Sequence, residues 1–254
     1  MCAPALSVVL PAWNEAVRLP PFLERVESYL QVRFPNAWEV IVVDDGSRDG
    51  TGEFLEKRAR PPSPIRVRTH PVCRGKGAAV RTGMLAASGR RLLFADADGA
   101  TPIEEADSLL AALDGGADIA IGSRLAPAAG LRRRRNWRRR LAGAGFAWLA
   151  RLWLGISARD TQCGFKMFDR RAARDLFQPL QETGYLFDLE VLARAQRAGY
   201  RVVEAPVNWS EVPGGHLCLL REACRIPAGL WRIRRRLRNL DPKSPDGPHT
   251  GTRK

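Results

Sequence analysis

The sequence has 254 residues, of which 45% are hydrophobic, and this suits one domain of the larger α/β kind. Its formal net charge of +14 implies attraction to an anionic partner: nucleic acid, an acidic membrane surface or phosphorylated substrates. The five cysteines are odd in number and form no C-x-x-C pair, so we expect a reducing cytosolic setting and neither a disulfide framework nor a zinc site. No apolar stretch reaches the about 20 residues of a membrane span, and the N-terminus lacks the pattern of a signal peptide, so we expect neither.

Short apolar runs alternate with helix-like segments through the first half of the chain. We predict strands at residues 6–10, 38–43, 65–69, 92–95 and 118–121, and helices at residues 19–29, 51–57, 78–87 and 103–113. The alternation predicts an α/β fold of Rossmann-like type, in which a mostly parallel sheet carries helices on both faces. Ligands of such sheets bind beyond the carboxyl ends of the strands. The missing G-x-G-x-x-G after the first strand excludes an NAD-dependent oxidoreductase.

Two acids, Asp96 and Asp98, follow the predicted strand at residues 92–95. Alternate residues of an extended chain face the same way, so both carboxylates can address one point, where Mg²⁺ or Mn²⁺ would relieve their repulsion. Taken alone, acids at a strand end more often form turns and helix caps. Other predicted strands, however, also end in polar residues: Asn14, Glu15, Asp44, Asp45 and Arg124. Polar and charged residues at the ends of several strands together indicate one site.

A glycine-rich basic segment at residues 74–77 opens the predicted helix at 78–87. Glycines allow the backbone to come close to a ligand, and a helix N-terminus favours an anion. Lys76 would add a full positive charge at this position. The alternative is a solvated basic loop with flexible glycines.

The second half of the chain contains two strongly basic segments. Arginines dominate residues 132–140, an apolar stretch rich in tryptophan follows at 141–154, and residues 230–240 repeat the basic, partly amphipathic pattern. We interpret both as helices that lie on an anionic membrane surface, with tryptophans at the level of the headgroups. The alternative for residues 141–154 is an ordinary core helix. Between them we expect a strand near 165–168, a helix to about 198 and a strand at 202–205.

Eight short motifs together make the chain resemble the family 2 glycosyltransferases, which have the GT-A fold. Within that family it resembles the polyprenyl-phosphate sugar synthases, nearest to those that glucosylate dolichyl phosphate. The motifs are VVLPAWNE (8–15), VVDDGSRDGT (42–51), RGKGAAVRTGM (74–84), DADG (96–99), GSR (122–124), RDTQCGFKMF (159–168), FDLE (187–190) and PVNW (206–209). The resemblance covers about residues 6–209, and we expect a catalytic domain at 1–211, including an interface segment at 131–155. From their composition we expect a basic segment at 212–240 and a disordered tail at 241–254.

The resemblance also implies roles for individual residues. The nucleotide-sugar pocket would include Lys76 near the diphosphate, together with Pro11, Asn14, Glu15, Asp44, Asp45 and Asp96. Asp96 and Asp98 would hold the metal, and Asp98 counts among the catalytic residues. The acceptor phosphate would face Arg124, Arg138 and Lys166. Family members with hydroxyl acceptors often carry a base in a Glu-Asp pair; this chain has Phe187-Asp188 there, so Asp188 or Asp160 is the candidate base.

The implied reaction is an inverting transfer of a hexose, most simply glucose from UDP-glucose, to dolichyl or undecaprenyl phosphate. The enzyme would need Mg²⁺ or Mn²⁺ and dock peripherally on the cytoplasmic face of a membrane. The alternatives are mannose from GDP-mannose, a hydroxyl acceptor, nucleotide-sugar binding without transfer, and a basic nucleic-acid-binding protein. We expect no specific nucleic-acid partner, because aromatic stacking motifs are not evident and the charge lies beside tryptophan stretches. The sequence does not determine the oligomeric state.

Overall fold

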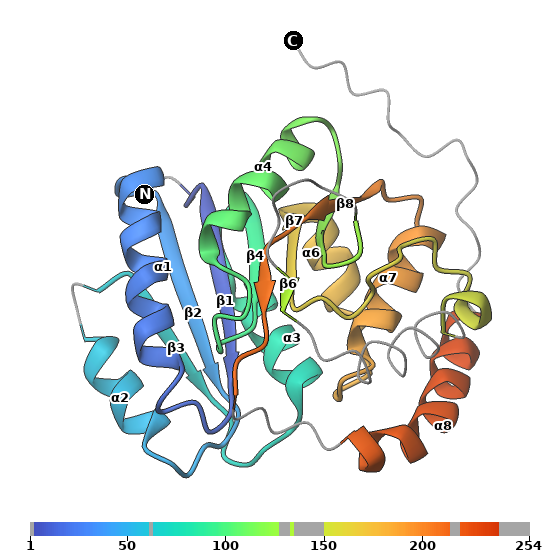
Figure 1. Ribbon diagram of the computed structural model, residues 1–254, viewed down its shortest axis with the longest axis horizontal. Coiled ribbons are helices and arrows are strands. Elements are labelled where there is room, and N and C mark those ends of the chain that lie inside the picture. Colours follow the sequence, from blue (N-terminus) through green and yellow to red (C-terminus); the bar gives the residue numbers. More distant parts are fainter. Residues whose placement is uncertain (1–2, 61–62, 127–132, 135–149, 214–218, 239–254) are drawn as a thin grey trace.

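A seven-stranded mixed sheet forms the centre of the computed structural model, and helices cover both of its faces (Figure 1). The structure describes residues 3–60, 63–126, 133–134, 150–213 and 219–238. Its strands are β1 (Leu6–Ala12), β2 (Trp38–Asp44), β3 (Ile65–Thr69), β4 (Arg91–Ala95), β5 (Ile119–Ser123), β6 (Arg133–Arg134), β7 (Phe165–Asp169), β8 (Val202–Pro206) and β9 (Trp209–Ser210). Its helices are α1 (Leu19–Arg33), α2 (Thr51–Arg58), α3 (Lys76–Ala86), the 3₁₀ turn η1 (Ile103–Glu105), α4 (Ala106–Asp114), α6 (Arg170–Phe177), α7 (Phe187–Arg197) and α8 (Leu219–Arg238). Residues 150–154 are also helical.

The strand order is β3-β2-β1-β4-β7-β5-β8, and only β7 runs antiparallel to its neighbours. The predicted mostly parallel sheet is therefore confirmed. Successive residues of a strand face opposite sides of a sheet, and the two sides here form two apolar clusters. Val9 and Phe94 face one cluster, which includes residues of α3, α6, α7 and α8, whereas Val8 and Leu93 face the other, with α1 and α4. Burial on both sides explains why the strands are nearly continuous apolar runs.

The antiparallel strand β7 lies between β4 and β5 and controls the position of the loop before it. Phe165, the first residue of β7, pairs with Ala95, the last residue of β4. The loop 160–164 therefore lies at the carboxyl end of β4, beside the acids that follow that strand. The sequence predicted a strand here but not its direction or its neighbours.

Several elements differ from the expectation. The helix expected at 103–113 begins as the 3₁₀ turn η1 and continues as α4. Helix α6 was not expected; the Asp169 side chain caps it by accepting a hydrogen bond from the Arg171 backbone N–H. Helix α8 begins at Leu219, well before the basic segment expected at 230–240. None of the helices in the described ranges has both the length and the apolar character needed to cross a membrane. Arg138, most of the segment 131–155 and the tail 241–254 lie outside the described residues.

Candidate active site

Hydrogen bonds connect the two loops beyond the ends of β1 and β2, which carry residues predicted to contact a nucleotide. Asn14 has a positive φ of 55° and exchanges hydrogen bonds with the second loop: its N–H donates to Ser47 Oγ, and its Oδ1 accepts from Arg48 N–H. The N–H of Glu15 donates to Thr51 Oγ1, at the start of α2. Asp44 Oδ1 accepts from the Ser47 N–H. These hydrogen bonds fix the two loops relative to each other.

Asp45 holds the loop that leads into α3. It is only 3% exposed, and both of its carboxylate oxygens are engaged. Oδ1 lies 2.6 Å from His70 Nδ1 and accepts from the Arg74 N–H at 2.9 Å. Oδ2 accepts from the Gly75 N–H at 2.8 Å and from the thiol of Cys73 at 3.3 Å. Asp45 thus orients the glycine-rich segment directly; its expected contact with the nucleotide stays a prediction.

Asp96 and Asp98 follow β4 and are close enough for the charge of Asp96 to act on Asp98. That both bind one metal ion stays a prediction. Burial raises the pKa of Asp98, and the neighbouring charge of Asp96 raises it further. Asp96 Oδ1 is buried and accepts no well-aligned hydrogen bond from a described residue, although Lys76 Nζ forms an ion pair with it at 2.6 Å. Two neighbouring carboxylates that repel each other are hard oxygen donors and fit a divalent cation. The described residues contain no cluster of three or more metal-binding side chains, so such an ion would take its other ligands from water and a diphosphate.

Gly164 gives Asp96 the space that its carboxylate occupies. The Asp96 N–H donates to the carbonyl oxygen of Gly164 at 2.9 Å, which draws the two backbones together. A Cβ atom on Gly164 would lie 1.9 Å from Asp96 Oδ2, far inside van der Waals contact. The sequence analysis did not single out this glycine, because the contact depends on β7 lying antiparallel beside β4.

Lys166 and Asp188 form a buried ion pair, and the charge of Asp96 acts on Asp188. Lys166 Nζ donates to Asp188 Oδ1 at 2.6 Å and to the Cys163 carbonyl oxygen at 2.5 Å. The lysine is 1% exposed and the aspartate 3%. Burial raises the pKa of Asp188, against the lowering effect of Lys166 and then Lys76. Lys166 is therefore neutralised by Asp188 and shielded from solvent, and its expected contact with a phosphate stays a prediction.

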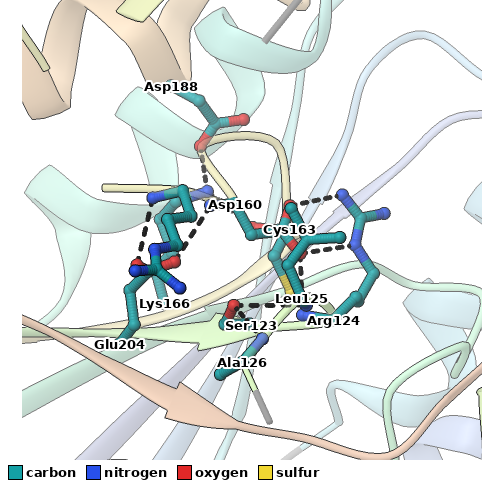
Figure 2. A network of polar contacts seen from close by, with 10 residues as sticks. Ser123, Arg124, Leu125, Ala126, Asp160, Cys163, Lys166, Asp188 and Glu204 are labelled. Carbon is teal, nitrogen blue, oxygen red and sulfur yellow. Dashed lines mark hydrogen bonds and ion pairs between the residues drawn. The ribbon is translucent and has the colours of Figure 1, made fainter. Parts of the chain in front are cut away.

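The second predicted cation, Arg124, forms a bidentate ion pair with Asp160 (Figure 2). Its Nε and Nη2 lie 2.9 and 2.7 Å from the two carboxylate oxygens, and its backbone N–H donates to Asp160 Oδ2 at 2.7 Å. Glu204 of β8 accepts from the N–H groups of Asp160 and Arg159 and so fixes the loop. Burial alone would raise the pKa of Asp160, but Arg124 outweighs burial and lowers it. Asp160 is consequently a weak proton acceptor.

The fold thus brings most of the expected residues to one region, the end of β4 and its surroundings. Lys76, Asp96 and Asp188 interact electrostatically, and the charge of Asp96 also reaches Arg124. Both lysines lie near one aromatic ring: Nζ of Lys76 and Nζ of Lys166 are 5.8 and 5.4 Å from the centroid of Phe94. Arg138 lies outside the described residues. Sequence reasoning missed His70, Gly164 and Glu204, which act through contacts between distant segments.

Residues 7–177 match the family model for glycosyl transferase family 2. Among characterised proteins, the chain is 42% identical over 253 residues to a dolichyl-phosphate beta-glucosyltransferase of Drosophila melanogaster, covering 90% of this chain and 77% of the relative. It is 36% identical over 251 residues to the protein of the same name from Homo sapiens (90% and 78%), and 34% identical over 248 residues to that of Saccharomyces cerevisiae (90% and 74%).

Solved structures with the same fold are more distant in sequence. Glucosyl-3-phosphoglycerate synthase of Mycobacterium tuberculosis in complex with UDP superposes with a TM-score of 0.66 at 22% identity, over 91% of this chain and 80% of that one. Mannosyl-3-phosphoglycerate synthase of Rubrobacter xylanophilus gives a TM-score of 0.66 at 20% identity, over 92% and 74%. The Mycobacterium enzyme has also been solved with Mn²⁺, UDP-glucose and phosphoglyceric acid, with a TM-score of 0.63 at 21% identity, over 91% and 79%. The expected glycosyltransferase fold is confirmed.

Proposed function

The chain belongs to glycosyl transferase family 2, and from this premise we propose that it transfers glucose from UDP-glucose to dolichyl phosphate or a related polyprenyl phosphate. That the chain is a glycosyltransferase follows from the family. The choice of sugar and acceptor is supported by the names of the relatives, which match over about nine-tenths of this chain. The observation that carries the proposal is the position of the segment 159–168: Asp160, Gly164 and Lys166 contact Arg124, Asp96 and Asp188 respectively.

The donor would bind at the ends of β1, β2 and β4. Asn14, Glu15 and Asp44 shape the rim for the nucleotide, and Lys76 would meet the diphosphate. Asp96 and Asp98 would hold Mg²⁺ or Mn²⁺, which when bound would neutralise charge on the leaving diphosphate. The Mn²⁺ complex of the Mycobacterium enzyme supports a divalent ion. Lys76 pairs with Asp96 in this structure, so its ammonium is already placed beside the acids that would hold the metal.

The acceptor explains why this site needs no strong base. A phosphate monoester has a second pKa of about 6 and is mostly a dianion at neutral pH. One of its oxygens would attack the anomeric carbon on the face opposite the departing UDP, which inverts the configuration. Asp188 is held by Lys166, so we assign it the orientation of the sugar or the acceptor, and proton removal is not required of it. The bidentate pair with Arg124 and its low pKa make Asp160 a positioning group as well.

A polyprenyl phosphate resides in a membrane, and one surface of the protein suits an anionic bilayer. Leu152, Trp153 and Trp231 expose 68%, 45% and 55% of their surface. Arg234 stacks 4.5 Å above the ring of Trp153, and Arg235 lies 5.5 Å from that of Trp231. Tryptophans flanked by arginines would bury their rings among headgroups while the guanidinium groups contact lipid phosphates. We infer peripheral docking through this surface, on the cytoplasmic face.

The decisive experiment is a transfer assay in detergent with radiolabelled UDP-glucose or GDP-mannose and dolichyl or undecaprenyl phosphate. We expect lipid-soluble label from UDP-glucose with Mn²⁺ or Mg²⁺ and none after addition of EDTA. Lipid-soluble label from GDP-mannose but not from UDP-glucose would show that the transferred sugar is mannose and not glucose. Metal-dependent release of UDP without lipid label would support the assignment of the donor site and contradict that of the acceptor.

A further inference from the structure

The loop between α6 and α7 packs directly on the N-terminus of α3, where Lys76 begins the helix. The Ala78 N–H donates to the carbonyl oxygen of Thr183 at 3.2 Å. A Cβ atom on Gly75 would lie 2.5 Å from that same oxygen, and one on Gly77 would lie 2.6 Å from the carbonyl oxygen of Glu182. A side chain at either of the glycines that flank Lys76 would therefore collide with this loop, whether or not a ligand also approaches them. The position of the loop therefore sets the position of Lys76.

Glu190, on the first turns of α7, holds the loop from behind. Its side chain is completely buried, and Oε2 accepts from the Glu182 N–H at 2.9 Å. Oε1 accepts from both Nε and Nη2 of Arg194, at 3.0 and 2.8 Å. A buried carboxylate is stable only when charged partners and donors surround it. Glu190 connects the loop to those partners.

Helix α8 supplies the remaining charge. Nη1 of Arg236 lies 3.2 Å from Glu190 Oε2 and 3.6 Å from Glu182 Oε2, so one guanidinium joins the buried acid to the loop acid. Nη2 of Arg232 lies 3.5 Å from the same oxygen of Glu182. The helix is fixed beside α7 by close packing, because a Cβ atom on Gly229 would lie 2.3 Å from Leu186. Figure 1 shows α8 beside α7, on the far side of it from the sheet centre.

We propose that Arg236 is a positioning residue for the donor site: through Glu190 and Glu182 it holds the loop 181–184 against the N-terminus of α3, and so fixes Lys76. Without Arg236 the two carboxylates keep Arg194 and the half-exposed Arg232 as their cations among the described residues. The loop would then open more often. The C-terminal helix is on this view part of the donor site, although it lies outside the segment that the family model matches.

The test compares R236Q with R238Q in the full-length protein by amide hydrogen exchange. Arg238 is exposed on the same helix and forms no ion pair with another described residue, so its replacement changes the charge equally. We expect R236Q to accelerate exchange at the Ala78 amide by about tenfold, as for the loss of one charge-assisted contact, with exchange in β1 and β2 unchanged. R238Q should match the wild type. R236K, which keeps the charge, should fall between them.

Kinetics give a second readout, which rests on the proposed function. We expect R236Q to raise the KM for UDP-glucose about tenfold while kcat changes little, since the donor contact is affected and the chemistry is not. The inference is overturned if Ala78 exchanges in R236Q as it does in R238Q. If the wild type also transfers no glucose, the proposed function is contradicted. The hydrogen-exchange result then decides this inference by itself.

Discussion

Replacing Gly164 by alanine tests how closely the loop before β7 must approach Asp96. The backbone of Gly164 does not have a positive φ, so alanine is conformationally acceptable there and the only direct effect is steric. Its Cβ atom would lie 1.9 Å from Oδ2 and 2.2 Å from Cγ of Asp96. The carboxylate must therefore move by more than 1 Å to restore contact at about 3.5 Å. Such a movement changes the position of the carboxylate relative to Asp98 and Lys76.

We expect G164A to raise the apparent dissociation constant for Mn²⁺, measured in the presence of UDP, by about 10–100-fold, as do changes that misplace a metal ligand. Overpacking should also lower the free energy of unfolding by about 1–3 kcal/mol. G115A is the matched control, because Gly115 lies on the surface at the end of α4 and its Cβ atom would meet only Ala111 and Ala112 at 3.3 and 3.4 Å. Wild-type affinity for Mn²⁺ in G164A would refute the reasoning.

Three further predictions concern the other parts of the site. D98A should lower metal-dependent transfer about 100-fold with an unchanged circular dichroism spectrum; near-normal turnover would contradict the metal assignment. D160N should destabilise the protein by about 3 kcal/mol at pH 7, because the largely buried guanidinium of Arg124 loses its partner. Folding lowers the pKa of Asp160. The ionised carboxylate therefore stabilises the fold at pH values above its pKa in the unfolded chain, about 4, and this stabilisation is lost as the pH falls below that value. Urea titrations at pH 7 and pH 3 should therefore show a difference from wild type that narrows in acid. Replacing Trp153 and Trp231 together by alanine should weaken binding to phosphatidylserine vesicles about tenfold or more, whereas unchanged sedimentation with vesicles would contradict the docking surface.

The sequence was sufficient where local pattern decides structure. The apolar runs predicted the strands, because the period of an extended chain is a local property. The sequence also placed Asp96 and Asp98 directly after β4, although residues 97 and 98 form a turn there and do not continue the strand. The partner of Lys166 could not be predicted in the same way. Its ion pair with Asp188 requires β7 to be antiparallel beside β4 and α7 to begin above it, which no local pattern encodes.

The glycines beside Lys76 illustrate the same limit. Their pattern predicts close approach of the backbone to a ligand, but it does not indicate that the loop 181–184, more than a hundred positions along the chain, packs against them. Likewise, the motif favours a contact of Asp45 with the nucleotide, which stays a prediction, but it does not indicate that four groups of the loop before α3 surround this carboxylate. Contacts between segments that are distant in sequence decide both cases.

The placement of β7 has a consequence for how the protein is made. During synthesis, β1 to β4 can pair as soon as they leave the ribosome, but β5 has no neighbour until β7 has emerged, since β7 separates β4 from β5. At about 5–20 residues per second this interval lasts a few seconds, during which the open edge of β4 and the apolar β5 are exposed to pairing with other chains. The strand that places Gly164 and Lys166 therefore also covers the open edge of β4 and gives β5 its first neighbour.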